Sequence, residues 1–167
     1  MENVYETNRL NLCVFDASHL EAVKDFWGDD DVMQLCNGAT SHEKLLKVID
    51  AYRKCHEVNG LSVYAVKDKE TEEVIGAAGF NITGPLSEVE LIYHFNKKSW
   101  GKGFATEAAK ACLEIAKNHG KVQIVTASVS PENKGSLLIL EKIGFTFKEM
   151  KWFDDTEQEE PYYEYKI

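Results

Sequence analysis

The sequence predicts one mixed α/β domain in which helices cover a sheet. Three observations support this fold class. Short β-prone runs alternate with segments of helical periodicity, glycine or proline marks many of the junctions, and no linker, repeat or low-complexity tract interrupts the order. A length of 167 residues suits one domain with its own hydrophobic core. We therefore expect a single domain over residues 1–167, with elements in the order β-α-α-β-β-β-α-β-α-β-β.

The expected strands are short segments in which apolar, β-branched and aromatic residues alternate or cluster. The polar segment 68–73 separates the second and third of them as a hairpin loop, and the acidic segment 154–160 separates the last two. We expect strands at residues 9–14, 61–66, 74–80, 88–95, 122–129, 145–153 and 162–167, about seven in all.

The expected helices have apolar residues at helical spacing. Ser18 and Thr40 are each followed three residues later by glutamate, which is the pattern of a capping box at a helix start. Glycine follows three of the segments, as it commonly does at helix ends. We interpret the aspartates at 29–31 as a solvated turn, and we expect about four helices near residues 18–27, 40–59, 104–119 and 130–143.

Composition narrows the class of protein. The formal charge is −9, from 19 lysines and arginines against 28 aspartates and glutamates, and such a surface repels the phosphates of nucleic acid. No apolar run is long enough to cross a bilayer, and the N-terminus lacks the features of a secretory signal. The four cysteines lack CxxC spacing, so we expect reduced thiols and no metal. These features predict a cytoplasmic protein that binds neither nucleic acid nor membrane, and they are compatible with a homodimer.

The segment from Trp100 to Ala105, Trp-Gly-Lys-Gly-Phe-Ala, joins an expected strand to an expected helix. Its two glycines allow positive φ and let a ligand approach the backbone closely. The free N–H groups and the dipole of a helix start bind phosphate, and Lys102 adds a local cation. The segment predicts a phosphate-binding turn, with a plain glycine-containing connection as the alternative at this point.

Three classes of nucleotide ligand compete for this turn. A P-loop requires GxxxxGK[ST], but Lys102 and Gly103 are followed by Phe104. A dinucleotide-binding turn requires glycine or alanine where this chain has Thr106, and the strand at 122–129 ends without an acidic residue for a ribose. The pyrophosphate of an acyl-CoA is the remaining ligand.

Two further segments change the weight of these alternatives. Residues 130–136 (Ser-Pro-Glu-Asn-Lys-Gly-Ser) and 141–145 (Glu-Lys-Ile-Gly-Phe) resemble the second signature of the GNAT superfamily of N-acetyltransferases. The first signature, (Q/R)xxGx(G/A), maps onto residues 100–105, with Trp100 in place of Gln or Arg. Residues 100–108 and the opening Thr-Asn-Arg-Leu-Asn-Leu at 7–12 are similar to the branch that includes the ribosomal-protein N-terminal (alanine/serine) acetyltransferases. The resemblance implies a twisted, mixed but mostly antiparallel central sheet and an acetyl-CoA-dependent N-acetyltransferase.

The resemblance also implies roles for individual residues. Asn133 would hydrogen-bond the pantetheine arm of acetyl-CoA, and the backbone N–H of Ile92 would stabilise the oxyanion. Many members carry a general-acid tyrosine where this chain has Leu140, so Ser136 is the expected partner of the leaving thiolate. The pyrophosphate would be bound by Trp100, Gly101, Lys102, Gly103, Phe104, Ala105 and Thr106.

Direct attack of an amine on the thioester needs a base, and the strand at 88–95 offers two candidates. Alternation places Glu90, Ile92 and His94 on one side of this strand. A partly desolvated carboxylate can have its pKa raised towards neutrality, which suits it to accept an ammonium proton. Glu90 is therefore the first candidate, acting directly or through water, and His94 the second. Glu107 is interpreted as a first-turn acid that favours the helix dipole.

The acceptor is a primary amine whose identity the sequence does not specify. By analogy with the family, the acidic segment 154–160 and the first two helices would flank it and attract a cationic peptide or polyamine, with Trp27, Trp152 and Tyr162 as aromatic candidates for the lining. A protein or peptide N-terminus competes with a small amine, either a polyamine or an antibiotic. Two other classes stay open: a non-catalytic acyl-CoA-binding module, which Leu140 favours, and an interaction domain with a vestigial turn.

Overall fold

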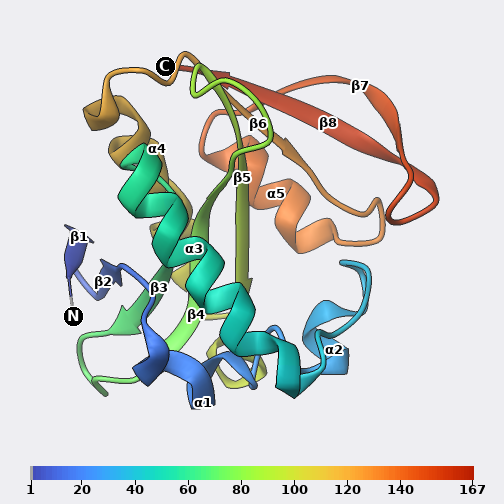
Figure 1. Ribbon diagram of the computed structural model, residues 1–167. Coiled ribbons are helices and arrows are strands. Elements are labelled where there is room, and N and C mark those ends of the chain that lie inside the picture. Colours follow the sequence, from blue (N-terminus) through green and yellow to red (C-terminus); the bar gives the residue numbers. More distant parts are fainter. Residues whose placement is uncertain (1) are drawn as a thin grey trace.

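The computed structural model describes residues 2–167 and contains one eight-stranded sheet, in which the strands lie in the order β1-β2-β3-β4-β5-β6-β8-β7 (Figure 1). Neighbouring strands are antiparallel except for the parallel pair β5–β6. The expected mixed, mostly antiparallel sheet is therefore confirmed. The strands are β1 (Asn3–Glu6), β2 (Leu10–Cys13), β3 (Val63–Asp68), β4 (Val74–Asn81), β5 (Glu88–Phe95), β6 (Ile124–Ser128), β7 (Thr146–Phe153) and β8 (Gln158–Lys166).

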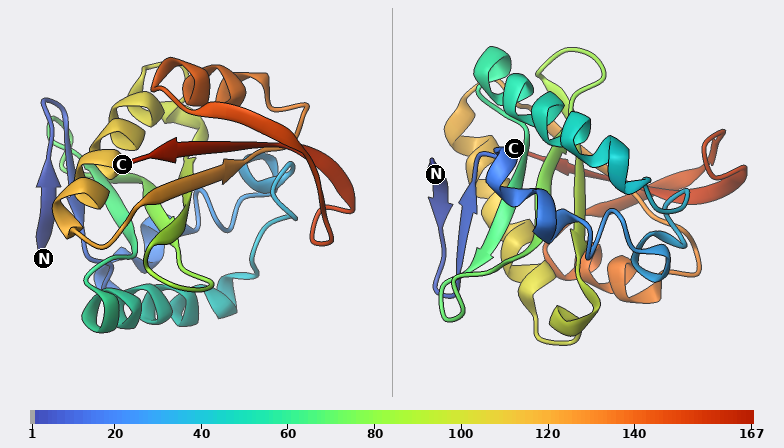
Figure 2. Two further views of the ribbon diagram at one scale, coloured as in Figure 1. Left: turned by 90° about the horizontal axis from the view of Figure 1, so that it is seen from above. Right: turned by 60° about the horizontal axis from the view of Figure 1, so that its bottom comes forward.

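Helices cover both faces of the sheet. Figure 2 shows α3 on one side and α4 with α5 on the other, so the chain forms three layers. The first two helices are short and pack with α3 on the same face. The helices are α1 (Leu20–Val23), α2 (Asp30–Met33), α3 (Leu45–Asn59), α4 (Phe104–His119) and α5 (Lys134–Lys142).

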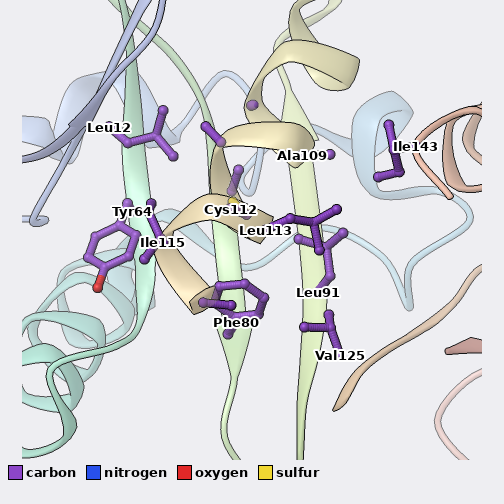
Figure 3. Packing of buried hydrophobic residues seen from close by; sticks show 14 of the residues in the cluster. Leu12, Tyr64, Phe80, Leu91, Ala109, Cys112, Leu113, Ile115, Val125 and Ile143 are labelled. Carbon is purple, nitrogen blue, oxygen red and sulfur yellow. The ribbon is translucent and has the colours of Figure 1, made fainter. Parts of the chain in front are cut away.

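The larger part of the core lies between α4 and the sheet. The helix places Ala109, Cys112 and Ile115 among its buried residues, and they pack against strand residues such as Phe80 and Leu91 (Figure 3). Small residues at most buried positions of α4 let the helix lie close to the sheet, and burial of the apolar surface stabilises that contact. The position of α4 in turn determines where the turn before it lies.

Several local predictions are wrong at the N-terminal end of the chain. The sequence does not predict β1, because this short edge strand is half exposed and has no apolar alternation. Asp16, rather than Ser18, accepts the capping hydrogen bonds at the first helical turn. Asp29 accepts a hydrogen bond from the Val32 N–H at 3.0 Å and so begins α2, where we expected a solvated turn. No side-chain capping bond forms at the start of the segment before α3.

The C-terminal hairpin also differs from the prediction. β8 begins at Gln158, four residues before the expected start, so the connection to β7 consists of residues 154–157 alone. As a result, Glu160 lies in a strand and is only 5% exposed, whereas its neighbour Glu159 is exposed.

Within residues 2–167 no helix combines the length and apolar character needed to cross a membrane. All four cysteines are free thiols; Cys13 and Cys112 are buried and the other two are partly exposed.

Candidate active site

The candidate site lies where β5 and β6 separate. Their parallel pairing covers Glu88–Ile124, Val89–Val125 and Glu90–Thr126 and then stops, although β5 continues to Phe95. Figure 1 shows β6 running away from β5, with α5 beside the resulting opening. The opening exposes one edge of β5 in the middle of the sheet, where a ligand can bind to the backbone.

The hydrogen-bond register shows which amides of β5 face this opening. The Asn96 N–H donates to the Ile75 carbonyl at 2.9 Å, and the β4–β5 pairing runs without a shift to Asn81–Glu90. Bond direction alternates along an antiparallel strand, so even-numbered residues of β5 direct their N–H groups to β4. The Ile92 amide consequently faces Gly79 of β4 and points away from the opening.

On the other edge of β5, odd-numbered residues face β6. The parallel Glu90–Thr126 pair uses the N–H of Leu91 and the carbonyl of Thr126. The Tyr93 amide is therefore the first N–H beyond the paired residues, and it faces the opening. Of the amides near Glu90, the one that can reach a ligand in the opening belongs to Tyr93 and not to Ile92.

The turn before α4 has the features of an anion site. Gly101 and Gly103 have φ of 75° and 80°, which glycine adopts without strain. Among the described residues, the N–H groups of residues 101–106 have no protein acceptor, and Gly103 is an N-cap without a side-chain bond. The Trp100 indole donates to the Phe95 carbonyl at 2.9 Å and ties the turn to the end of β5.

This turn fits the pyrophosphate of coenzyme A. A Cβ added at Gly101 would meet no protein atom within 4 Å, so the backbone is open on that side. The 16-residue α4 follows directly, and its N-terminal dipole and free N–H groups favour a negatively charged group. Lys102 is exposed and adds a positive charge to a chain with a net charge of −9.

Asn133 and Ser136 lie at the start of α5, as their signature implies. The Asn133 side chain accepts a hydrogen bond from the Ser136 N–H at 3.1 Å and is the N-cap of α5. Ser136 is 6% exposed, and its hydroxyl lies 2.6 Å from the hydroxyl of Tyr93. Leu140, on the next turn, is fully buried. The helix therefore presents a hydroxyl, backed by a phenol, towards β5.

Sequence reasoning missed Tyr93. Alternation places it on the same side of β5 as Leu91 and Phe95, which is the side covered by α4 and α5. This alternation could have identified Tyr93 from the sequence, because a tyrosine on the side of β5 that faces the helices can contact a residue of α5. Burial raises the pKa of Tyr93 to about 12, with the bond to Ser136 opposing the shift, so the phenol carries its proton at neutral pH.

Glu90 lies on the opposite side of β5. Its carboxylate accepts a hydrogen bond from the Asn81 side-chain amide at 3.2 Å. The Oδ1 of the same Asn81 side chain accepts a hydrogen bond from the Tyr52 hydroxyl at 3.4 Å. Burial raises the pKa of Glu90; the bond from Asn81 opposes this shift, and the negative charges of Asp155 and Glu160 add to it. A half-buried carboxylate with a raised pKa is suited to accept a proton near neutral pH.

His94 is held in a different state. The Trp27 indole donates to its Nδ1 at 3.3 Å, so the lone pair on that nitrogen is already engaged. Burial lowers the pKa of His94 to about 4, and the ring is neutral at neutral pH. The structure thus distinguishes the two base candidates by their hydrogen bonds.

Carboxylates from the final hairpin approach Glu90 on its own side of the sheet. Glu160 is almost fully buried and forms no salt bridge in the described part of the chain. Its Oε2 accepts hydrogen bonds from Gln158 at 2.8 Å and from Thr156 at 3.2 Å. Burial raises the pKa of Cys36, and the charge of Glu160 adds to that shift, which places this thiol near the same carboxylate.

The three aromatic candidates for the acceptor lining lie in different environments. Trp27 is 5% exposed and belongs to the core beneath α3, whereas Trp152 is 57% exposed on β7. Tyr162 is half buried, and the Lys151 ammonium lies 4.6 Å from the centroid of its ring. Trp27 donates a hydrogen bond to His94, and Trp152 donates one to Asp154 of the acidic segment at 2.8 Å. No group of three His, Cys, Asp or Glu side chains within residues 2–167 is arranged to hold a metal ion.

Comparison with known proteins identifies the family. The family model described as acetyltransferase (GNAT) domain matches residues 9–146. An uncharacterised N-acetyltransferase, p20 of Bacillus licheniformis, is 28% identical over 151 residues, which cover 87% of this chain and 83% of that protein.

Solved structures agree with this assignment. A GNAT-family acetyltransferase from Bacillus anthracis is 25% identical, with a TM-score of 0.82 over 97% of this chain and 96% of that chain. The structure of RimL, a ribosomal L7/L12 alpha-N-protein acetyltransferase in complex with coenzyme A, has a TM-score of 0.85 at 18% identity, over 99% of this chain and 98% of that chain, and shows likeness of fold. From the family match and the geometry together, the chain belongs to the GNAT family of acetyltransferases and uses acetyl-CoA.

Proposed function

We propose that this enzyme transfers the acetyl group of acetyl-CoA to a primary amine by direct attack in the opening between β5 and β6. The observation that carries the proposal is the arrangement around β5. Glu90 lies on one side of the strand, the Tyr93–Ser136 pair lies on the other, and the anion-binding turn follows its end. A thioester bound along the open edge of β5 would lie between a base and a hydroxyl group.

The first step is loss of a proton from the ammonium group of the acceptor. Glu90 is the proposed base, directly or through water, because its raised pKa lies nearer to neutrality than that of an exposed glutamate. His94 is the weaker candidate, since its Nδ1 accepts the Trp27 hydrogen bond and its pKa is about 4. The neutral amine then attacks the thioester carbon, and holding both reactants in line can contribute about 7–11 kcal/mol in well-oriented cases.

The second step develops negative charge on the carbonyl oxygen. We assigned this oxyanion to the Ile92 amide by family resemblance, but the register directs that N–H group to β4. The Tyr93 amide faces the opening instead, and we propose it as the donor. The sulfur then leaves as coenzyme A thiolate.

The third step is stabilisation of the thiolate. Ser136 is proposed to donate a hydrogen bond to it, with Tyr93 donating in turn to the Ser136 hydroxyl at 2.6 Å. The acceptor ammonium loses two protons over the whole reaction: Glu90 passes one to solvent, and the second ends on the coenzyme A sulfur. The thiol of coenzyme A, with a pKa of about 8.5 like that of a free cysteine, is a good leaving group as the thiolate. The contribution of the Tyr93–Ser136 pair to the rate is therefore modest.

For the acceptor, the acidic surroundings of Glu90 support a cationic amine. Glu160 and Asp155 both act on Glu90 through their charge, and Glu160 has no cationic partner among the described residues. A polyamine would supply a second ammonium group for this carboxylate. A protein α-amine is the other candidate; it is the group named for RimL, and here it rests on likeness of fold alone.

The test combines binding with turnover. Acetyl-CoA is titrated calorimetrically, and release of free thiol is then followed with peptides that begin with alanine or serine, with polyamines and with monoamines that have no second charged group. We expect heat with acetyl-CoA and thiol release with at least one amine class. Heat without thiol release from any amine would favour a non-catalytic acyl-CoA-binding module, and absence of heat would overturn the donor assignment as well.

A further inference from the structure

Arg9 is placed at the anion-binding turn by contacts that span the sequence. Its Nε donates to the Glu107 carboxylate at 2.7 Å and its NH1 group donates to the Lys102 carbonyl at 2.9 Å. Its guanidinium lies 4.4 Å from the centroid of the Phe104 ring. Three segments meet at this one side chain: the start of β2, the turn itself and the first turn of α4.

Glu107, in the first turn of α4, binds both the side chain and the backbone of Arg9. Its second carboxylate oxygen accepts hydrogen bonds from the Arg9 N–H at 2.9 Å and from the Thr7 hydroxyl at 2.5 Å. Burial would raise the pKa of Glu107, but the bonds from Thr7 and Arg9 outweigh it and keep the pKa below its ordinary value. The carboxylate is therefore charged at neutral pH and fixes the guanidinium plane.

The bond to Lys102 determines the orientation of one peptide group. A trans peptide is planar, and its C=O and N–H point in opposite directions. Because Arg9 holds the Lys102 carbonyl towards β2, the N–H of Gly103 in the same peptide must point away from β2. That N–H belongs to the series at residues 101–106 that has no protein acceptor.

We propose that Arg9 is a positioning residue for the donor: with Glu107, it holds the Lys102–Gly103 peptide so that the turn is preformed for the pyrophosphate of acetyl-CoA. The inference rests on the proposed function. Two of its three nitrogen groups, Nε and NH1, are engaged by Glu107 and Lys102, and these bonds hold the turn. The third group, NH2, lies beside Gly103, so the CoA affinity of Glu107→Gln separates positioning of the turn from direct contact with the phosphate. Preorganisation of this kind lowers the ordering cost of binding.

The experiment compares two acetyl donors in the wild type and in variants of Arg9, Glu107 and Lys98. S-acetylpantetheine has the same thioester as acetyl-CoA but lacks the pyrophosphate. For Arg9→Gln we expect the Kd for CoA, measured by calorimetry, to rise by about tenfold or more, because hydrogen bonds to charged groups are lost. The KM for acetyl-CoA should rise to match. The kcat/KM for S-acetylpantetheine should stay within about twofold of wild type, within the scatter of such comparisons.

Lys98→Gln is the matched control. Lys98 and Arg9 both line a groove of about 810 Å³ beside the turn, but the Lys98 ammonium pairs with Glu73 and donates no hydrogen bond to the turn in the described structure. Arg9→Lys keeps the charge but loses the planar fork, and we expect it to restore less than half of the lost binding energy. Glu107→Gln should also weaken CoA, and the Arg9→Gln/Glu107→Gln double variant should be close to the worse single variant.

Each result has a defined meaning. Equal losses in Arg9→Gln and Lys98→Gln would show a general charge effect and overturn the proposal. Equal losses with both donors would show that Arg9 has a purely structural role. Unchanged binding of CoA would show that Arg9 has no role in donor binding, and would overturn the proposal. A Glu107→Gln variant that binds CoA more tightly would identify Arg9 as a direct phosphate ligand. If Arg9→Gln loses its cooperative melting transition, Arg9→Lys decides the question. Failure of the wild type to bind acetyl-CoA would contradict the proposed function instead.

Discussion

The proposed donor side and the proposed acceptor side of the opening are built in different ways. On the donor side, backbone N–H groups of a glycine turn face outward, and their positions depend on a helix start and on Arg9. On the proposed acceptor side, three separate elements contribute side chains: Asn81 of β4 donates a hydrogen bond to Glu90 of β5, and Glu160 of β8 acts on Glu90 through its charge. Backbone sites recognise a constant group such as pyrophosphate, whereas side-chain sites can differ between relatives with the same fold. Membership of the GNAT family therefore identifies the donor, whereas the acceptor depends on side chains that belong to this chain.

The largest effect is expected on the acceptor side. Glu90→Gln removes the proposed base and should lower kcat by about 10²–10⁴-fold, with little change in CoA affinity. A protonated carboxyl cannot accept the ammonium proton, so the wild-type rate should fall as pH is lowered through the raised pKa of Glu90. A pH–rate profile measured by thiol release checks both points. Glu88→Gln, an exposed change two residues away on the same side of β5, is the control. Full activity of Glu90→Gln with the acid limb retained would transfer the role to another group.

A smaller effect is expected on the donor side. Gly101→Ala places a Cβ in the left-handed region, at a cost of about 1–2 kcal/mol, and directs it into the open side of the turn. We expect CoA to bind about tenfold more weakly, with kcat at saturating donor nearly unchanged. Urea unfolding measures the loss of stability, calorimetry measures the CoA affinity, and steady-state kinetics measure kcat. Gly84→Ala is the control, because an added Cβ there meets no atom within 4 Å and its φ is not positive. Equal CoA affinity in both variants would argue against a ligand at this turn.

Glu160→Gln should alter acceptor recognition more than chemistry. Removal of a buried charge should raise KM for a diamine or polyamine about three- to tenfold, and leave KM for a monoamine without a second ammonium group nearly unchanged. Because the charge of Glu160 raises the pKa of Glu90, its loss should also move the acid limb of the rate profile to lower pH. Glu159→Gln, an exposed neighbour, is the control. A uniform rise in KM for all amines would contradict charge recognition.

The smallest effect is expected for the thiolate partners. Ser136→Ala and Tyr93→Phe each remove one hydroxyl of the 2.6 Å pair and should lower kcat by about two- to fivefold, the scale of one ordinary hydrogen bond. Because the two act in series, the double variant should be little worse than Ser136→Ala. Steady-state kinetics of the four proteins measure this coupling. Additive losses would show that the two hydroxyls act independently.

Much of the donor side is predictable because its signals are local. Two glycines before an amphipathic segment predict the turn and α4, whereas α5 begins at Lys134 with Asn133 as its N-cap, later than the start expected near residue 130. The rest of the candidate site is less predictable. The burial of Glu160 depends on a strand that begins earlier than its sequence indicates, and the bond between Tyr93 and Ser136 joins residues 43 apart. The choice between the amides of Ile92 and Tyr93 requires the pairing of β5 with both of its neighbours.

By itself, the sequence determined the fold class, the position of the glycine turn before α4 and the side of β5 on which each residue lies, because all three follow from spacing along a short segment. Tertiary structure alone decided how far β5 and β6 remain paired, which amides face the opening and which carboxylates approach Glu90. It also decided that Arg9 reaches Glu107, 98 residues away, and holds the turn between them. Hydrogen bonds of this kind depend on distances between distant segments, and those distances exist only after the sheet and its helices have packed.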